Sequence, residues 1–229
     1  MHQPEIFKKV RVWDLPTRAF HWSLVLCTLG LAGTGINGGS AMEWHMRLGY
    51  AVLTLLLFRI VWGLVGGRWS RFAAFVYAPH SVINYLRGKG KPEHEVGHSP
   101  TGALSVFAML AVLLAQVASG LVSDDEIAYS GPLTSLVSNA TVSLASNYHA
   151  NIGKWLLLAL VCMHAAAIFF YQRRKKSLVG AMLHGDKTLP MTVPSSRDDI
   201  ASRTAALLIL SAWGALVYWV LALAQQPAF

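Results

Sequence analysis

The sequence predicts an all-α integral membrane protein: a bundle of four transmembrane helices followed by a fifth, C-terminal one. Of the 229 residues, 54% are hydrophobic and only 13% are charged, whereas soluble domains are usually about 45–50% apolar and about 25% charged. Five separate stretches are apolar over roughly the 20 residues that a helix needs to cross about 30 Å of hydrocarbon. Almost all basic residues fall between these stretches, as they do in the loops of membrane proteins.

The five predicted spans cover residues 19–36, 44–65, 101–122, 148–171 and 205–224. The first is not a cleavable signal peptide, because eighteen polar and mixed residues precede it and its apolar run is too long. Ser99-Pro100 predicts the start of the third span, with serine as the N-cap and proline at the first helical position. Segments 67–100 and 172–204 contain several prolines and are predicted to be loops or surface helices.

The distribution of lysine and arginine predicts the orientation of the chain. Sixteen of these residues lie before the first span, between the second and third, or between the fourth and fifth, including the run Arg173-Arg174-Lys175-Lys176. The opposite loops, residues 37–43 and 123–147, contain none. Because cytoplasmic loops are rich in Lys and Arg, we expect the N-terminus inside and the C-terminus outside. The net charge of +8 therefore indicates orientation and not nucleic-acid binding.

Cysteine content excludes several classes of protein. Cys27 and Cys162 are the only two cysteines, which is too few for a disulfide scaffold or a cysteine-type zinc site. The sequence has no Cys-x-x-Cys-His motif, so we expect no covalently attached c-type haem.

Four histidines lie within predicted spans, where ionisable residues are costly and usually functional. In the predicted orientation His21 and His164 lie toward the inner ends of spans one and four, while His45 and His149 lie near the outer ends of spans two and four. They therefore form two pairs at matching depth. His149 and His164 are fifteen residues apart, which is about 22 Å along a helix and about 60° around it, so both can face one bundle interior.

Two such pairs predict two haem groups stacked across the membrane, because each flat macrocycle takes one axial imidazole from each side. Any one of these histidines alone could equally be a structural hydrogen-bonding residue. Zinc is the competing ligand, but zinc binds three or four ligands together, and each depth offers two. We therefore predict the iron ligands as the pairs His21/His164 and His45/His149, and no catalytic residue.

Three arginines are candidates for holding haem propionates. Arg59 lies fourteen residues after His45, about 21 Å deeper, which places it near the inner pair. Arg18 is a second candidate there, and Arg47 is the candidate near the outer pair. Arg18 and Arg47 could equally extend to the membrane interface without binding a propionate.

Other polar and small residues leave two readings open. His98 is a candidate proton acceptor for a quinol, in a pocket expected near the inner haem with Arg59, or else a solvated loop histidine. The histidines of polar segments, His2, His80, His94 and His184, are predicted to be solvated. The glycines in spans one and two either admit a macrocycle or mark tight helix contacts; they are Gly30, Gly33, Gly35 and Gly49.

Several motifs resemble those of bacterial b-type cytochromes of the cytochrome b561 and nickel–iron hydrogenase cytochrome b group. They are Val12-Trp13-Asp14-Leu15-Pro16-Thr17-Arg18 followed by His21-Trp22, His45-x-x-Leu48-Gly49-Tyr50, Phe58-Arg59-x-x-Trp62-Gly63, Gly97-His98-Ser99-Pro100-x-Gly102 and Met182-x-x-Gly185. The resemblance covers about residues 10–190 and implies a four-helix core with two b haems, ligated by His21, His45, His149 and His164. We expect a dihaem domain over residues 1–190, and a linker with an extra, peripheral or partner-docking helix over residues 191–229.

The resemblance implies an electron carrier of the bacterial inner membrane, working between quinone and a periplasmic c-type cytochrome or hydrogenase-like subunit. The acidic outer loop Asp124-Asp125-Glu126 would suit a basic partner or is simply solvated. One alternative is a superoxide:quinone oxidoreductase, although outer loops without Lys or Arg would attract an anion poorly. Another is a membrane-anchor subunit of a redox complex. Whether the chain is an enzyme stays open, as does its oligomeric state; membrane lipid and quinone are expected partners, and nucleic acid is not.

Overall fold

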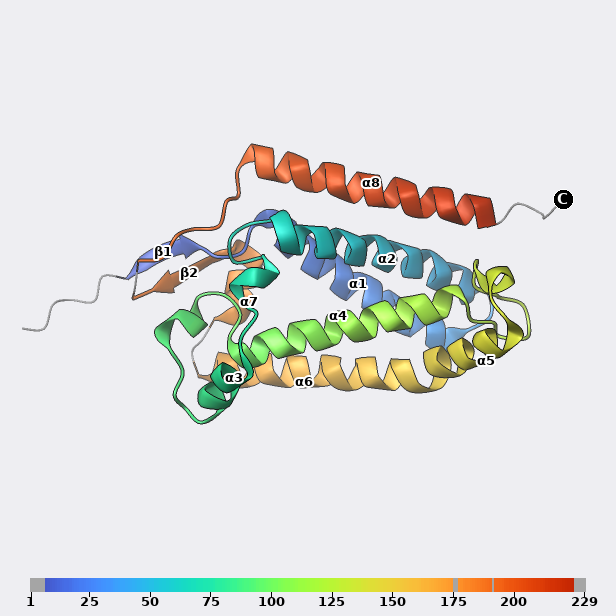
Figure 1. Cartoon of the computed structure of the whole chain (residues 1–229), viewed down its shortest axis with the longest axis horizontal. Coiled ribbons are helices and arrows are strands. Elements are labelled where there is room, and N and C mark those ends of the chain that lie inside the picture. The colour runs from blue at the N-terminus through green and yellow to red at the C-terminus, as the bar shows by residue number, and fades with distance from the viewer. Residues whose placement is uncertain (1–6, 175–176, 191, 225–229) are drawn as a thin grey trace, which may run out of the picture. The chain divides into compact units, whose positions relative to one another are not determined.

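The computed structural model describes residues 7–174, 177–190 and 192–224, so Lys175 and Lys176 of the basic run lie outside the described residues. Five of its helices are long and apolar enough to cross a membrane. These findings confirm the predicted all-α fold class, and the chain is a multi-pass membrane protein (Figure 1). The five candidate spans are Leu15–Asn37, Ala41–Val65, Pro100–Leu121, Asn139–Arg173 and Ile200–Ala224.

The helices and strands follow one another in an order that Figure 1 labels. They are β1 (Lys8–Arg11), α1 (Leu15–Asn37), α2 (Ala41–Val65), α3 (Pro79–Leu86), α4 (Pro100–Leu121), α5 (Asn139–Asn147), α6 (Lys154–Arg173), α7 (Leu178–His184), β2 (Asp186–Leu189) and α8 (Ile200–Ala224). Short 3-10 helices cover Phe72–Ala74, Pro92–Glu95 and Thr134–Leu136, and a π-helical turn, Tyr148–Gly153, joins α5 to α6. The predicted start of the third span is confirmed, since α4 begins at Pro100 and the Ser99 hydroxyl accepts a hydrogen bond from the Gly102 N–H at 3.2 Å.

The fourth span begins earlier than the sequence predicts. Instead of a loop up to residue 147, α5 runs from Asn139 and continues through the π-helical turn into α6. The Ser138 side chain caps α5 by accepting a hydrogen bond from the Thr141 N–H. Hydropathy does not predict α5, because its residues are largely polar. The helix begins at a capping residue and not at the start of an apolar run.

A two-stranded antiparallel sheet, which the sequence does not reveal, joins the two ends of the expected cytochrome domain. Lys8 of β1 pairs with Leu189 of β2, and Arg11 pairs with Asp186, with which it also forms an ion pair at 2.9 Å. Gly185, between α7 and β2, has a φ of 88°, a left-handed conformation that glycine adopts without strain. Its carbonyl accepts hydrogen bonds from the Val12 and Trp13 N–H groups.

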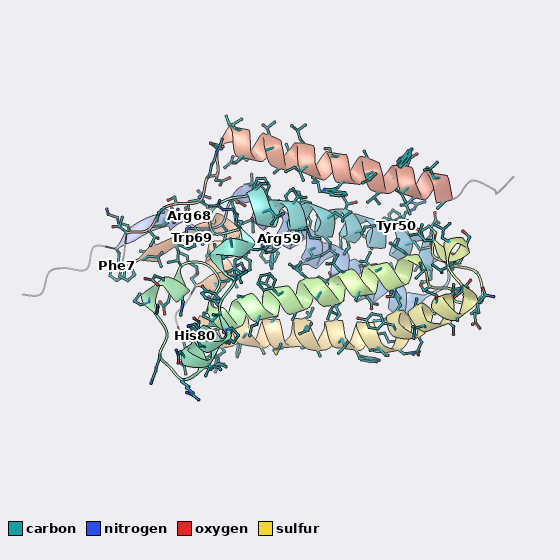
Figure 2. The ribbon with its side chains drawn as sticks, in the orientation of Figure 1. Phe7, Tyr50, Arg59, Arg68, Trp69 and His80 are labelled. Atoms are coloured by element: carbon teal, nitrogen blue, oxygen red, sulfur yellow. The ribbon has the colours of Figure 1, made fainter. Side chains whose placement is uncertain are left out.

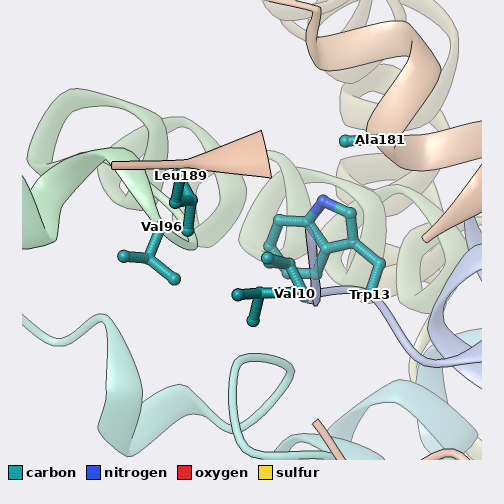
Figure 3. Close-up of a cluster of buried hydrophobic side chains, with 6 residues drawn as sticks. Val10, Trp13, Val96, Ala181 and Leu189 are labelled. Carbon is teal, nitrogen blue, oxygen red and sulfur yellow. The ribbon is translucent and has the colours of Figure 1, made fainter. Parts of the chain in front are cut away.

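The chain divides into two compact units, and each long helix contributes to both. Unit 1 comprises Met1–His21, Arg59–Phe107 and Met163–Leu207, and unit 2 comprises Trp22–Phe58, Ala108–Cys162 and Leu208–Phe229. A buried apolar cluster in unit 1 joins β1, β2, α7 and the segment before α4, as Figure 3 shows around Trp13. Its buried members are Val10, Val12, Trp13, Val96, Ala181 and Leu189.

Asp14 organises the rest of unit 1. Its side chain is fully buried and caps α1 by accepting a hydrogen bond from the Thr17 N–H at 2.8 Å. The same carboxylate accepts bonds from the Trp62 indole, the Gly67 N–H and the Ser70 hydroxyl. A single carboxylate thus ties the start of α1 to the end of α2.

The core of unit 2 comes from four helices. Buried Val52 and Leu56 of α2 and Leu113 of α4 pack with side chains of α1, α4 and α6. Helix α8 instead lies beside α2, since its Leu216 and Val217 line an apolar groove with Leu53 and Leu57. Within unit 2, the described part of α8 therefore lies outside the four-helix core.

Candidate functional site

Unit 2 brings His45 of α2 and His149 of the π-helical turn together. Their ring centroids are 6.1 Å apart and their planes are nearly perpendicular, at 85°. π-Helical turns are rare and occur frequently at functional sites. The turn here carries one member of the pair.

A backbone carbonyl orients each of these imidazoles. Nδ1 of His45 donates to the Leu31 carbonyl of α1 at 3.1 Å, with the Thr34 hydroxyl 3.2 Å away. Nδ1 of His149 donates to the Gln116 carbonyl of α4 at 2.8 Å. Since a carbonyl only accepts, both rings carry their proton on Nδ1, which leaves the Nε2 lone pair available to a metal.

Small residues make room for both rings. A Cβ atom on Gly120 of α4 would lie 2.8 Å from Cε1 of His149, and one on Gly35 of α1 would lie 3.2 Å from Cε1 of His45. Gly153 similarly admits the Gln116 side chain, whose amide donates to the His149 carbonyl at 3.0 Å. Gly35 of α1 and Gly120 of α4 thus restrict where the two imidazole rings can lie.

The spacing of this pair fits two imidazoles on one iron. Metal–imidazole bonds are about 2 Å long, and the ring centres of His45 and His149 are 6.1 Å apart. One metal ion would therefore fit between the two rings and could be bound by a nitrogen of each. Among the described residues, no group of three or more His, Cys, Asp and Glu side chains is arranged to hold a metal ion.

The second histidine pair lies in unit 1. His21 of α1 and His164 of α6 are close enough to interact electrostatically. His98, in the segment before α4, interacts with both of them and with Arg59 and Lys187. The structure thus groups His21 with His164 and His45 with His149, and the ligation of haem iron by these two pairs stays a prediction.

The three candidate arginines lie in different surroundings. Arg59 of α2 is 3% exposed and lies over the Phe72 ring at 4.7 Å. Arg18 donates to the Leu183 carbonyl at 2.7 Å and lies 4.0 Å from Asp198, so α7 and that carboxylate occupy part of its hydrogen-bonding capacity. Arg47 is exposed, forms an ion pair with Glu43 and lies over the Trp44 ring.

One loop histidine, His94, is not solvated, contrary to prediction, and a second, His98, is only partly exposed. His94 is 8% exposed, because its ring packs against Tyr77 and Tyr85. His98 lies between the rings of Trp13 and Phe75, at 4.7 and 4.3 Å. Burial, together with the neighbouring Arg59 guanidinium, lowers the pKa of His98 to about 3, so its imidazole is neutral at neutral pH. His80 and His184 are exposed, as predicted, and His2 lies outside the described residues.

The residues that position the histidine rings were not predicted from the sequence. Gln116 and Gly120 are four residues apart on α4 and so share one helix face, and both contact His149. A glutamine in the middle of an apolar span was the available signal. The wider role of Asp14 had no such signal, since the partners of its carboxylate other than Thr17 are distant in sequence.

An all-α membrane bundle in which His45 and His149 face each other and are held by backbone carbonyls has the features of a membrane cytochrome of the b type. The family model of the prokaryotic cytochrome b561 matches residues 12–185, and the chain belongs to this family, whose haem is haem b. The expected resemblance is thereby confirmed.

Curated relatives carry hydrogenase-related names. The chain is 24% identical over 186 residues to the "Probable Ni/Fe-hydrogenase 1 B-type cytochrome subunit" of Escherichia coli strain K12, covering 67% of this chain and 79% of the relative. It is 24% identical over 216 residues to the "Probable Ni/Fe-hydrogenase B-type cytochrome subunit" of Rhizobium leguminosarum bv. viciae, covering 79% and 89%. It is 29% identical over 129 residues to the similarly named protein of Azotobacter vinelandii, covering 45% and 54%.

Proposed function

We propose that this chain carries single electrons across the membrane through two haem b groups, between the quinone pool and a redox partner on the periplasmic side. His45 and His149 hold the outer haem, and His21 and His164 hold the inner one. The observation that carries this proposal is the 6.1 Å spacing of the His45 and His149 rings, which suits one iron. Each haem supplies one-electron redox chemistry when bound.

The chain's own residues determine where electrons can enter and leave. The Leu31 and Gln116 carbonyls hold the outer imidazoles in the tautomer that binds iron, and such second partners raise ligand basicity. Arg59 offers a buried positive charge that interacts with His98, and His98 in turn interacts with both inner histidines, so this charge suits a propionate of the inner haem. Arg18 and Arg47 are weaker candidates, since Asp198 and Glu43 already face them.

A hydrogenase-like subunit is the partner we favour over a c-type cytochrome. The relatives from three genera are named as B-type cytochrome subunits of Ni/Fe-hydrogenases. Quinone on the cytoplasmic side would exchange electrons with the inner haem. The sixteen-to-none distribution of basic residues across the two sides supports a cytoplasmic N-terminus in a bacterial inner membrane.

The test is electron transfer across a sealed vesicle. Purified protein is reconstituted in liposomes that contain ferricyanide, and dithionite, which does not cross the bilayer, is added outside. We expect ferricyanide consumption with the native protein, and its loss in both His149→Ala and His164→Ala, because an electron must pass both haems. His184→Ala, which changes an exposed histidine of α7, serves as the control and should transfer electrons normally.

Two results would contradict the proposal. Transfer that persists in either variant would show that the corresponding haem is not on the route. Purified protein without haem absorbance would favour an anchoring role. Reduction of both haems by a short-chain quinol in the purified protein tests the quinone part separately, and no reduction by any quinol would exclude it.

A further inference from the structure

Arg59 is a buried cation that forms no ion pair with any residue that the structure describes. Its side chain is 3% exposed, and Nη1 is shielded from solvent with no hydrogen-bond partner among the described residues. Figure 2 labels it on α2. Burying an uncompensated guanidinium costs several kcal/mol, so a native protein usually supplies a counter-ion.

The carboxylate of Asp14, which interacts electrostatically with Arg59, does not serve as that counter-ion. Its two oxygens are engaged by the donors of Thr17, Trp62, Gly67 and Ser70. No ion pair within 4.0 Å joins the two side chains in the described part of the chain.

The position of the guanidinium is fixed by its packing. It lies 4.7 Å over the Phe72 ring, and Phe72 in turn fits against Gly63, where a Cβ atom would overlap the ring. Phe72 also packs on Phe75 and Phe107. The Phe72 ring thus holds the Arg59 guanidinium in one place and leaves its Nη1 without a hydrogen-bond partner among the described residues.

His98 is a second unused donor in the same surroundings. Its Nδ1 is shielded from solvent and has no hydrogen-bond partner in the described structure. The ring is held between Trp13 and Phe75, and the Tyr77 hydroxyl donates to its backbone carbonyl at 2.9 Å. His98 interacts electrostatically with Arg59 and also with His164 and His21, so it connects the Arg59 guanidinium to the surroundings of the inner histidines.

We propose that Arg59 and His98 together form one carboxylate site, and that a propionate of the inner haem binds there, accepting from Nη1 of Arg59 and Nδ1 of His98. This inference rests on the proposed function and assigns His98 to the cofactor. A quinone carbonyl is neutral and would leave the guanidinium charge uncompensated, whereas a carboxylate compensates it and gives charge-assisted bonds.

The experiment is a potentiometric titration of both haems in the full chain. Arg59→Gln removes a positive charge near the inner haem and should lower its midpoint potential, because a nearby cation favours the reduced form. We expect at least a tenfold change in the reduction equilibrium constant, which is about 59 mV for a one-electron couple. His98→Leu should lower the same potential by a smaller amount, and the outer haem should be unchanged in both.

Two further variants separate a shared carboxylate from a structural role. His98→Asn restores a donor near the position of Nδ1 and should recover most of the potential. The double variant should shift the potential by less than the sum of the single shifts, because residues that hold one group are coupled. If Arg59→Gln does not accumulate with both haems, the midpoint potentials are measured in Arg59→Lys and His98→Leu instead. His94→Gln, at a buried histidine of the same segment, is the matched control and should have native potentials.

Native potentials in Arg59→Gln and His98→Leu, with both haems bound, would overturn this inference while leaving the proposed function intact. Quinol reduction that fails in His98→Leu at unchanged potentials would also overturn it, by assigning the residue to a quinone. Native protein with no haem at His21 and His164 would overturn the proposed function and this inference together, and haem quantification reveals that before any variant is made.

Discussion

His45 and His149 depend on carbonyl groups of neighbouring helices for the direction of their rings. The sequence was sufficient to find the histidines themselves, because an ionisable side chain in an apolar span is conspicuous. It was not sufficient to find Gly35 and Gly120, which lie against the rings. A glycine in a membrane helix has several common roles, and only the position of its neighbour distinguishes them.

Adding a methyl group beside each ring gives a graded prediction. Gly120→Ala should disturb the outer haem most, because the new Cβ would lie 2.8 Å from His149 Cε1, while Gly35→Ala, at 3.2 Å from His45, should do less. Overpacking of this kind costs about 1–3 kcal/mol. Haem content and the outer midpoint potential measure the effect. Gly214→Ala, whose Cβ would meet Thr54 at an ordinary 3.8 Å, is the control, and equal behaviour of all three variants would contradict the prediction.

At the scale of elements, the apolar helices were predictable and their ends were only partly so. Ser99-Pro100 marks the start of α4 in the sequence itself. The start of α1 depends instead on Asp14, whose other partners are Trp62, Gly67 and Ser70. The β1–β2 pairing likewise joins segments about 180 residues apart, as in Lys8 with Leu189. Because the two strands are so distant in sequence, no local pattern predicts that they pair.

Removing the Asp14 carboxylate should destabilise unit 1 strongly. Asp14→Ala deletes an N-cap and leaves several buried donors unsatisfied, which we expect to cost about 2–3 kcal/mol. Asp199→Ala removes the exposed cap of α8, where Asp199 accepts from the Ser202 N–H at 2.8 Å, and should cost less. Thermal unfolding followed by the haem spectrum compares the two. A smaller loss in Asp14→Ala than in Asp199→Ala would show that the buried carboxylate is not a structural centre.

At the scale of the whole molecule, the fold class, the number of spans and the orientation were predicted from hydropathy and from the distribution of charge. Five apolar helices were expected and five are present, and the paired histidines follow from the predicted orientation. Helix α8 was predictable as a span but not as a neighbour of α2, since its apolar residues face every direction and do not encode which helix they meet.

The proposed orientation has a direct consequence for the C-terminus. With five spans and a cytoplasmic N-terminus, a C-terminal alkaline phosphatase fusion should be active, because that enzyme folds in the oxidising periplasm. A fusion at the end of the fourth span should be inactive. The reverse pattern of phosphatase activity would overturn the orientation and exchange the inner and outer assignments of the two haems.

The central claim is that two histidine pairs hold two haems. Haem quantification combined with a redox titration of native protein and His164→Ala tests it most directly. We predict two haems per chain and two redox components in the native protein, and one haem with the potential of the outer component in the variant. A single component in the native protein, or two haems retained in His164→Ala, would contradict the account.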